Sequence, residues 1–260
     1  METSIRILIA DANEDFRAAL ADTIDAEDDG IHADHILTIG DPETGDGPEL
    51  TITDSTEGIE ATVINVYGGD MDVTSTDDAI NAASHMTISD GFVCAYSTGN
   101  DGLDSNGNMY IKGGVVYAIS AGGAEVALDA NTEGGYKLYV SGGTLFALGG
   151  LEGGAQLTQN CYSASWNKNA WYSLTVGEDT YAFKTPSAGG TPLVVSGASS
   201  PSLTSGVSAS GGTSHFEGLL LTDVAVSGGT SVTLSAYSGG NGGGGGGGNG
   251  PGGGGGHGPF

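Results

Sequence analysis

The sequence predicts an all-β protein: a parallel β-helix (solenoid) with a C-terminal antiparallel β cap and a short N-terminal segment of one strand and one helix. The main observation is a repeat within residues 26–158, in which a small residue followed by an aliphatic one recurs at positions 30, 58, 79, 102 and 127. Short alternating strands and glycine pairs follow each occurrence, and a turn of about 23 residues is the length of one β-helix coil. After residue 158 the pattern changes.

The N-terminal segment, residues 1–25, begins with IRILIA and an amphipathic stretch, which predict a strand and then a helix from about Asn13 to Ile24. It resembles the opening strand and helix of a response-regulator receiver domain, with Asp11 where such domains keep an acidic metal-site residue. The phosphoacceptor aspartate, the later lysine and the other receiver strands are missing, so no phosphorelay function follows. We interpret the segment as a fused remnant or an amphipathic cap, and no signal peptide is visible in it.

Residues 26–158 align into columns that alternate between inward and outward, because successive side chains of a strand point to opposite faces. Several columns are apolar in every coil, and we expect them to fill the core. This coil-to-coil agreement is a stronger fold signal than hydrophobic content alone. The main inward columns are Leu37, Ile64, Met86, Met109 and Leu138; Ile39, Val66, Ile88, Ile111 and Val140; Met71, Val93, Val116 and Leu145; and Ile31, Ile59, Ile80, Leu103 and Leu128.

Acidic residues follow the same register and gather at one corner of each coil. Stacking like charges at the roughly 4.8 Å spacing of neighbouring strands is unfavourable unless something neutralises them. Oxygen clusters with almost no nearby Lys or Arg suit calcium, so we favour calcium ligation over a merely solvated acidic face. The ligands predicted from these columns are Asp29, Glu57, Asp78, Asp101, Glu60, Asn81, Asp104, Asp129, Asp77 and Asn106.

Two aromatic pairs fall on outward columns of neighbouring coils. We expect Tyr110 to stack over Tyr139 and Tyr117 over Phe146, with Lys112 in an outward position beside Tyr110. Such a strip is a candidate carbohydrate-binding platform. Aromatic ladders also stabilise solenoids by cross-strand packing and can lie under a loop, so both interpretations stay open.

The formal net charge of −26, from 32 acidic and six basic residues, excludes several function classes. Nucleic-acid binding needs clustered Lys and Arg for phosphate contacts, and this chain would repel a polyanion or an anionic membrane surface. Membrane insertion is not expected, because no apolar run is long enough for a transmembrane span. Cys94 and Cys161 are too few for a disulfide framework, and whether they pair stays open.

Residues 159–238 lack the acidic repeat and read as strands separated by Gly, Ser and Pro, which predicts an antiparallel β cap closing the open end of the solenoid. We interpret Trp166 and Trp171 as buried anchors of this cap, with sugar stacking as the alternative. Residues 239–260 are glycine-rich and predict a disordered tail or linker without a core.

The phrases DDGIHAD, STEGIEA, TSTDDAINA and SGGT resemble the carbohydrate-binding β-helix domain family of bacterial cell-surface proteins, related in fold to pectate lyases, over about residues 27–240. The resemblance implies a right-handed parallel β-helix, bound Ca²⁺, an extracellular or cell-surface location and binding of plant cell-wall polysaccharide such as cellulose or pectin. The family's usual secretory signal and first coils are absent, which leaves export open. Its signature acids carry over to Asp28, Asp29, Asp34, Glu57, Glu60, Asp77, Asp78 and Asn81.

We therefore expect a non-catalytic, monomeric protein that binds polysaccharide with the help of calcium. The first alternative is a calcium-dependent, pectate-lyase-like enzyme, which would need a Lys or Arg base near the calcium. Lys112 and Lys137 are the only cationic side chains of the repeat, and neither lies in the acidic columns. The second alternative is a structural surface adhesin or spacer without glycan affinity.

Overall fold

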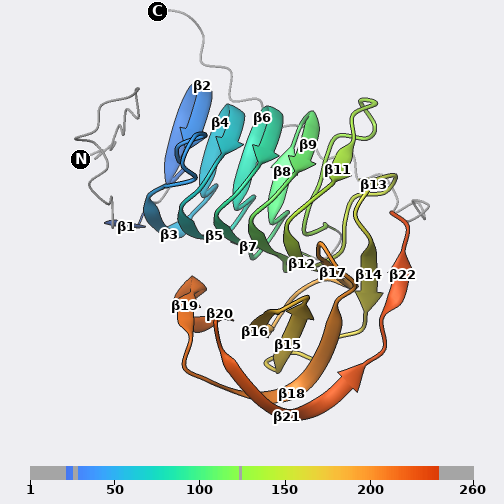
Figure 1. Ribbon diagram of the computed structural model, residues 1–260. Helices are drawn as coiled ribbons and strands as arrows, with labels where there is room; N and C mark the ends of the chain where they lie inside the picture. The colour runs from blue at the N-terminus through green and yellow to red at the C-terminus, as the bar shows by residue number, and fades with distance from the viewer. Residues whose placement is uncertain (1–21, 26–28, 123–124, 240–260) are drawn as a thin grey trace, which may run out of the picture.

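The computed structural model describes residues 22–25, 29–122 and 125–239, and almost all regular structure in this part of the chain is β-strand (Figure 1). Its single helical element is a 3-10 turn, Phe216–Gly218. Among these residues no helix is long and apolar enough to cross a membrane. The IRILIA strand, most of the predicted N-terminal helix, Asp28 and residues 240–260 of the predicted tail lie outside the described residues.

The predicted parallel solenoid is confirmed, because two parallel sheets are built from strands that alternate between them along the chain (Figure 1). Sheet B has the order β13-β11-β9-β6-β4-β2, with β8 also paired to β6. Its strands are β2 (Ile31–Ile39), β4 (Ile59–Val66), β6 (Ile80–Ile88), β8 (Leu103–Ser105), β9 (Asn108–Ile111), β11 (Leu138–Val140) and β13 (Gln156–Leu157). The parallel part of sheet A consists of β1 (Asp22–Asp25), β3 (Glu49–Ser55), β5 (Asp70–Ser75), β7 (Phe92–Ser97), β10 (Val115–Ser120) and β12 (Thr144–Leu148).

The strand register reproduces the columns expected from the repeat. Ile59 pairs with Ile31 on one side and Ile80 on the other, and the column continues through Leu103 to Leu128. These side chains belong to one aliphatic core enclosed between sheets A and B. Each coil thus buries its inward side chains against the neighbouring coils.

In the first coils, the apolar run after the small residue and the run before the glycine pair are not separate short strands. They join into one long strand, as in β2 and β4, and the register shifts between Ala33 and Ile36. A bulge of this kind bends a strand without ending its pairing. In the later coils the two runs stay apart: β8 and β9 both pair with β6, and Leu128 and Leu151 form isolated bridges separate from β11 and β13.

Glycine occupies two kinds of position in the coils. The second glycine of each turn pair, for example Gly114 and Gly143, has φ of +75° and +79°, a region that other residues avoid. At the small-residue positions the reason is space: a Cβ on Gly58 would fall on the Val73 side chain and on the Ala79 carbonyl oxygen. The repeat therefore depends on glycine for both turn geometry and coil stacking.

The predicted helix is wrong at its C-terminal end. Residues 22–25 form β1, which pairs in parallel with β3 in the register Asp22 to Leu50 and Asp25 to Thr53. The parallel pairing of sheet A therefore includes residues before position 26. Sheet pairing with the next coil outweighs the helical spacing of this short stretch.

The C-terminal part is antiparallel, as predicted, but it has two roles. Strands β17, β14 and β22 extend sheet A in antiparallel fashion beyond β12 and cover the end of the solenoid. The remaining strands form sheet C, which lies beside sheet A below the coils in Figure 1, so the cap covers a flank as well as the end. The C-terminal strands of sheet A are β14 (Cys161–Ala164), β17 (Leu193–Ser196) and β22 (Ser235–Tyr237). Those of sheet C are β15 (Trp171–Val176), β16 (Asp179–Lys184), β18 (Ser202–Ser210), β19 (Thr213–His215), β20 (Leu220–Thr222) and β21 (Ala225–Val232).

A second core lies between the outer side of sheet A and sheet C. It joins Tyr117 and Phe146 of the solenoid to Tyr172 and Phe183 of the cap. Trp166 is partly buried beside it and donates its indole N–H to the carbonyl oxygen of Gly190 at 3.0 Å. The two cysteines are buried and unpaired: Cys94 lies in this second core and Cys161 in the aliphatic core. The cap thus packs against the outward face of the repeat.

Candidate functional site

The acidic columns form one surface, here called the acidic corner, made of residues that precede or begin strands β2, β4, β6 and β8, together with Asp129, which follows the bridge residue Leu128. Within it His32, Glu60, Asn81 and Asp104 occupy equivalent positions on adjacent parallel strands. The alternation of each strand turns them away from the aliphatic core. The strand register therefore gathers the acidic residues at one corner, as predicted.

At the N-terminal end of the acidic corner, His32 lies among three carboxylates. Its Nδ1 is 2.7 Å from Oε2 of Glu60 and 3.3 Å from Oδ2 of Asp29, and its Nε2 is 3.5 Å from Oδ1 of Asp34. Burial alone would lower the pKa of His32, but Glu60 and Asp29 outweigh it, so the pKa is raised. The two carboxylates thus favour the protonated form of His32 at this end.

At the other end, Asp101, Asp104 and Asp129 each place an oxygen within 4.8 Å of the others. Burial, together with repulsion from Asp129 and Asp78, raises the pKa of Asp101 to about 9. Burial and repulsion from Asp129 raise the pKa of Asp104 to about 7, and burial and Glu152 raise that of Asp129 to about 7. This cluster therefore needs positive charge or protons.

Between the two ends, a side-chain amide and a backbone N–H donate hydrogen bonds to some of the carboxylate oxygens. Asn81 donates its side-chain N–H to Oε2 of Glu57 at 3.2 Å, and the Asp101 backbone N–H donates to Oδ1 of Asp78 at 3.0 Å. Burial is the main cause that raises the pKa of both Glu57 and Asp78 to about 7. The side-chain oxygen of Asn81 is buried without a hydrogen-bond partner. The middle of the acidic corner is thus partly buried and only partly satisfied by hydrogen bonds.

The remaining predicted ligands lie at the margins of these clusters. Asp77 accepts a hydrogen bond of 2.7 Å from the side chain of Asn100. Asp34 has a side chain that is 90 % exposed, and its nearest charged partner is His32. Asn106 is exposed, and its backbone carbonyl accepts a bond from Asn131. The carboxylates of Asp101, Asp104 and Asp129 thus converge on one point, whereas the side chains of Asp77, Asp34 and Asn106 belong to no such cluster.

Tyr110 and Tyr139 stack on neighbouring strands of sheet B, as the sequence predicted. Their ring centroids are 5.0 Å apart with an interplanar angle of 8°, and Nζ of Lys112 lies 5.3 Å from the centroid of Tyr110. Both side chains are partly exposed. Because each ring turns one face toward its partner, the pair offers only the faces turned away from it, not a continuous flat strip.

The second predicted platform, Tyr117 and Phe146, is wrong as a surface for sugar. Both side chains have 0 % exposure, because sheet C covers them. Their rings meet edge to face at 5.8 Å, and the Tyr117 hydroxyl donates to the carbonyl oxygen of Lys184 in the cap. The outward direction of these residues was predicted correctly, but the cap was expected at the open end of the solenoid and not over this face.

Polar residues of the same outward column continue on both sides of the tyrosine pair. In register order the column contains Thr87, Tyr110, Tyr139 and Gln156. Neither Thr87 nor Gln156 was among the predicted site residues, although their alignment with Tyr110 and Tyr139 was the available signal. A second omission is a hollow between solenoid and cap, for which no repeat or motif gives a signal.

Comparison with known proteins gives one match. A family model described as "Carbohydrate-binding domain-containing protein" matches residues 18–102, a stretch that includes every strand from β1 to β7. Neither the search of curated proteins nor the search of solved structures found a match. Together, the family match and the solenoid fit the carbohydrate-binding β-helix family that the sequence resembles and support carbohydrate binding in general.

Proposed function

We propose that this protein, as a relative of carbohydrate-binding β-helix domains, binds a plant cell-wall polysaccharide through the outward face of sheet B, without cleaving it. The observation that carries this proposal is the partly exposed Tyr110–Tyr139 stack on a regular parallel sheet. In the register the pair lies between Thr87, which is only 9 % exposed, and Gln156, which is exposed, so a sugar lying on the stack would meet an aromatic ring beside the polar side chain of Gln156.

The charge of the chain favours a neutral polysaccharide on this face. A neutral glucan such as cellulose needs only aromatic and hydrogen-bonding contacts. A polygalacturonate would be repelled by a net charge of −26 unless calcium ions bridged the two sets of carboxylates. Lys112, which lies against Tyr110, is the one basic side chain in contact with the stack among the described residues.

The binding face is tested with Tyr110→Ala/Tyr139→Ala, using Tyr136→Ala, whose side chain is 44 % exposed, as the matched control. Binding to insoluble cellulose and to polygalacturonate is measured, with and without a chelator. Losing two ring contacts should weaken binding by at least roughly tenfold, while Tyr136→Ala binds like wild type. Wild-type affinity in the double variant would contradict the proposed face, and polygalacturonate binding in excess chelator would contradict calcium bridging.

We further propose that the Asp101, Asp104 and Asp129 cluster holds Ca²⁺. Three convergent carboxylates without a basic partner suit a hard cation that takes oxygen ligands, and the unpartnered Asn81 oxygen in the same corner is a further donor of that type. The cluster around Asp29 suits it less, because the imidazole of His32 lies among its carboxylates, with Nδ1 3.3 Å from Oδ2 of Asp29. Bound calcium would neutralise stacked carboxylates and rigidify the coils behind the binding face.

Calcium is tested by calorimetric titration and thermal melting of wild type and of Asp101→Asn/Asp104→Asn, with the exposed loop variant Glu43→Gln as control. Calcium at 100 times its dissociation constant should stabilise wild type by about 2.7 kcal/mol. In chelator the double variant should melt above wild type, because repulsion is relieved, and calcium should not raise its melting point further. An unchanged wild-type melting point between chelator and calcium would refute this site.

A further inference from the structure

A groove lies between the solenoid and the cap, on the outer side of sheet A and therefore on the face of the solenoid opposite sheet B. It consists of two adjoining hollows of about 420 and 480 Å³, which share Glu178, Asp179 and Tyr181 as lining residues. One wall is the outer side of sheet A, and the other is the turn between β15 and β16 together with the segment between β20 and β21. The groove therefore exists only because the cap is docked on the solenoid.

The solenoid wall of the groove is a regular ladder. Phe92, Val115 and Thr144 occupy equivalent positions on β7, β10 and β12, which are adjacent parallel strands. At about 4.8 Å per strand this ladder is about 10 Å long and runs along the solenoid axis. A linear ligand lying in the groove would therefore cross the strands and meet three coils in succession.

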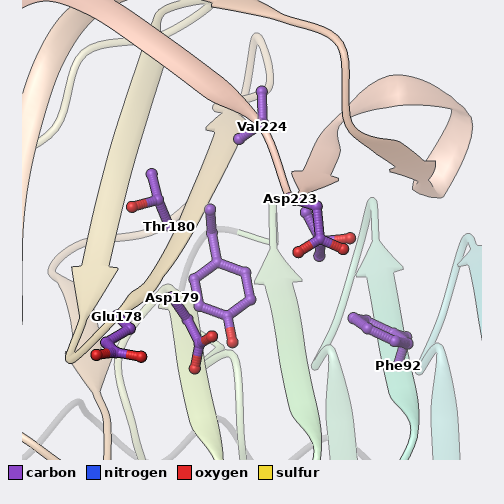
Figure 2. Close-up of a pocket in the computed structure, with 8 residues that line it drawn as sticks. Phe92, Glu178, Asp179, Thr180, Asp223 and Val224 are labelled. Atoms are coloured by element: carbon purple, nitrogen blue, oxygen red, sulfur yellow. The ribbon is translucent and has the colours of Figure 1, made fainter.

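The cap wall carries most of the charge. Glu178 and Asp179 come from the tight β15–β16 turn, and Asp223 comes from the segment before β21; Figure 2 shows these carboxylates together with Phe92 of the solenoid wall. All three acids are exposed, and no Lys or Arg lines either hollow. Asp223 has φ of +51°, so the backbone holds it in a conformation that few residue types adopt.

The lining selects the ligand by its hydrogen-bonding chemistry. Ionised carboxylates only accept hydrogen bonds, so the ligand has to donate many of them. A polyanion is repelled by the three acids. A single metal ion does not fit either, because among the described residues the acids that converge closely enough for an ion are in the acidic corner. An uncharged, hydroxyl-rich ligand satisfies both conditions, with the partly exposed Phe92, whose ring stacks on His215 with centroids 4.1 Å apart, as an apolar contact beside the acids.

We propose that this groove is a second carbohydrate-binding site, which takes a neutral oligosaccharide along the solenoid axis and contacts it with Glu178, Asp179 and Asp223. The proposal rests on the proposed carbohydrate-binding function but uses residues that the tyrosine face does not. It assigns part of the binding to the cap, which the family match to residues 18–102 does not cover. The protein thereby has two glycan sites on different sheets.

The test is calorimetric titration of the full chain with cellohexaose and, in parallel, with a hexamer of galacturonic acid. The groove variant is Glu178→Gln/Asp179→Asn/Asp223→Asn, which keeps side-chain size. The control is Asp54→Asn, because Asp54 is exposed on the solenoid and has a similar φ of +56°. A second variant, Ser199→Trp, places bulk in the second hollow from an exposed position. Circular dichroism confirms that each variant is folded.

Wild type and Asp54→Asn should bind cellohexaose at two sites, and the groove variant and Ser199→Trp should each lose one of them, with an affinity loss there of at least roughly tenfold. Tyr110→Ala/Tyr139→Ala should keep the groove site, and the acidic hexamer should not bind it. Unchanged two-site binding by both groove variants would overturn the groove and leave the proposed function standing. Binding only in the groove would overturn the tyrosine face, and no binding by wild type would overturn both.

Discussion

The solenoid and the cap are both built of β-strands, yet they obtain their cores in different ways. The solenoid encloses an aliphatic core of its own between two parallel sheets. Sheet C has no partner sheet within the cap; its aromatic side chains pack on Tyr117 and Phe146 of the solenoid's outer wall. The comparison teaches that the aliphatic core is enclosed mainly by the solenoid's own two sheets, whereas the burial of the aromatic side chains of sheet C depends on the solenoid surface. Three predictions test this dependence, in order of decreasing effect.

The largest effect is expected at the interface between the two regions. Phe146→Ala removes a fully buried ring that meets Tyr117, Tyr181 and Phe183, so the free energy of unfolding should fall by about 3–5 kcal/mol. Urea unfolding is measured by near-ultraviolet circular dichroism, with Tyr139→Ala as the control because it contacts no cap residue through its stack. A loss below about 1 kcal/mol would mean that the second core does not hold the cap.

A smaller loss of stability is expected from replacing one glycine in each of the two regions, and its physical cause should differ between them. Gly58→Ala inserts a Cβ between coils and should cost about 1–3 kcal/mol through overpacking. Gly206→Ala in β18 has nothing within 4 Å of its Cβ, so only its φ of +69° opposes the change, at about 1–2 kcal/mol.

Asparagine at the same two positions sharpens the comparison. Asn tolerates the left-handed conformation, so Gly206→Asn should be milder than Gly206→Ala, whereas Gly58→Asn should be worse than Gly58→Ala because it is larger. Thermal melting of the four variants gives the order. The same order at both positions would contradict the distinction between packing and backbone strain.

The smallest effect concerns pH at the contact between β5 and the turn Phe216–Gly218. Asp72 accepts the Phe216 backbone N–H, and burial and repulsion from Asp70 raise its pKa to about 6, against attraction by His215. Because the folded pKa lies above the unfolded one, the folded state binds more protons between pH 4 and pH 6, so stability falls as the pH rises through that window. His215 itself is buried, with Nδ1 2.6 Å from Oδ2 of Asp70, and it stacks on Phe92.

The measurement is the free energy of unfolding of wild type and Asp72→Asn at pH 4 and pH 7. The two proteins should be similar at pH 4, where Asp72 is protonated, and the variant should be the more stable at pH 7. Asp46→Asn, in an exposed loop, controls for the change in net charge. A variant that is less stable than wild type at pH 7 would show that the ionised carboxylate stabilises the cap instead.

The solenoid could be predicted from the sequence because equivalent positions in successive coils carry residues of the same type. A column such as Leu37, Ile64 and Met86 repeats the same environment, so the sequence contains several independent indications of one position. No such repetition exists in residues 159–238, and the sheet on which the cap packs is determined by tertiary contacts alone. That is why Tyr117 and Phe146 were correctly directed outward, while the sequence left open whether they are accessible or covered. β1 was missed because four residues carry too little pattern.

The candidate sites differ in the same way. The acidic corner and the Tyr110–Tyr139 stack follow directly from the register, so their positions could be predicted even though their ligands could not. The groove brings Phe92 beside Glu178 and Asp223, residues that are far apart in sequence and belong to no motif. Its existence follows from how two folding units dock, which no local pattern describes.

The antiparallel closure of sheet A fixes the C-terminal end of the solenoid, so the length of the molecule can be changed only nearer the N-terminal end. At β17 the parallel stacking stops, so a further coil cannot be added after β12 without rebuilding the cap. The cap contacts described above begin at Asp70 of β5, so one coil inserted between β3 and β4 would leave both the groove and the tyrosine stack intact. Duplication there would lengthen the molecule by about 4.8 Å per coil, a modular route by which related proteins can vary in reach while keeping their binding ends.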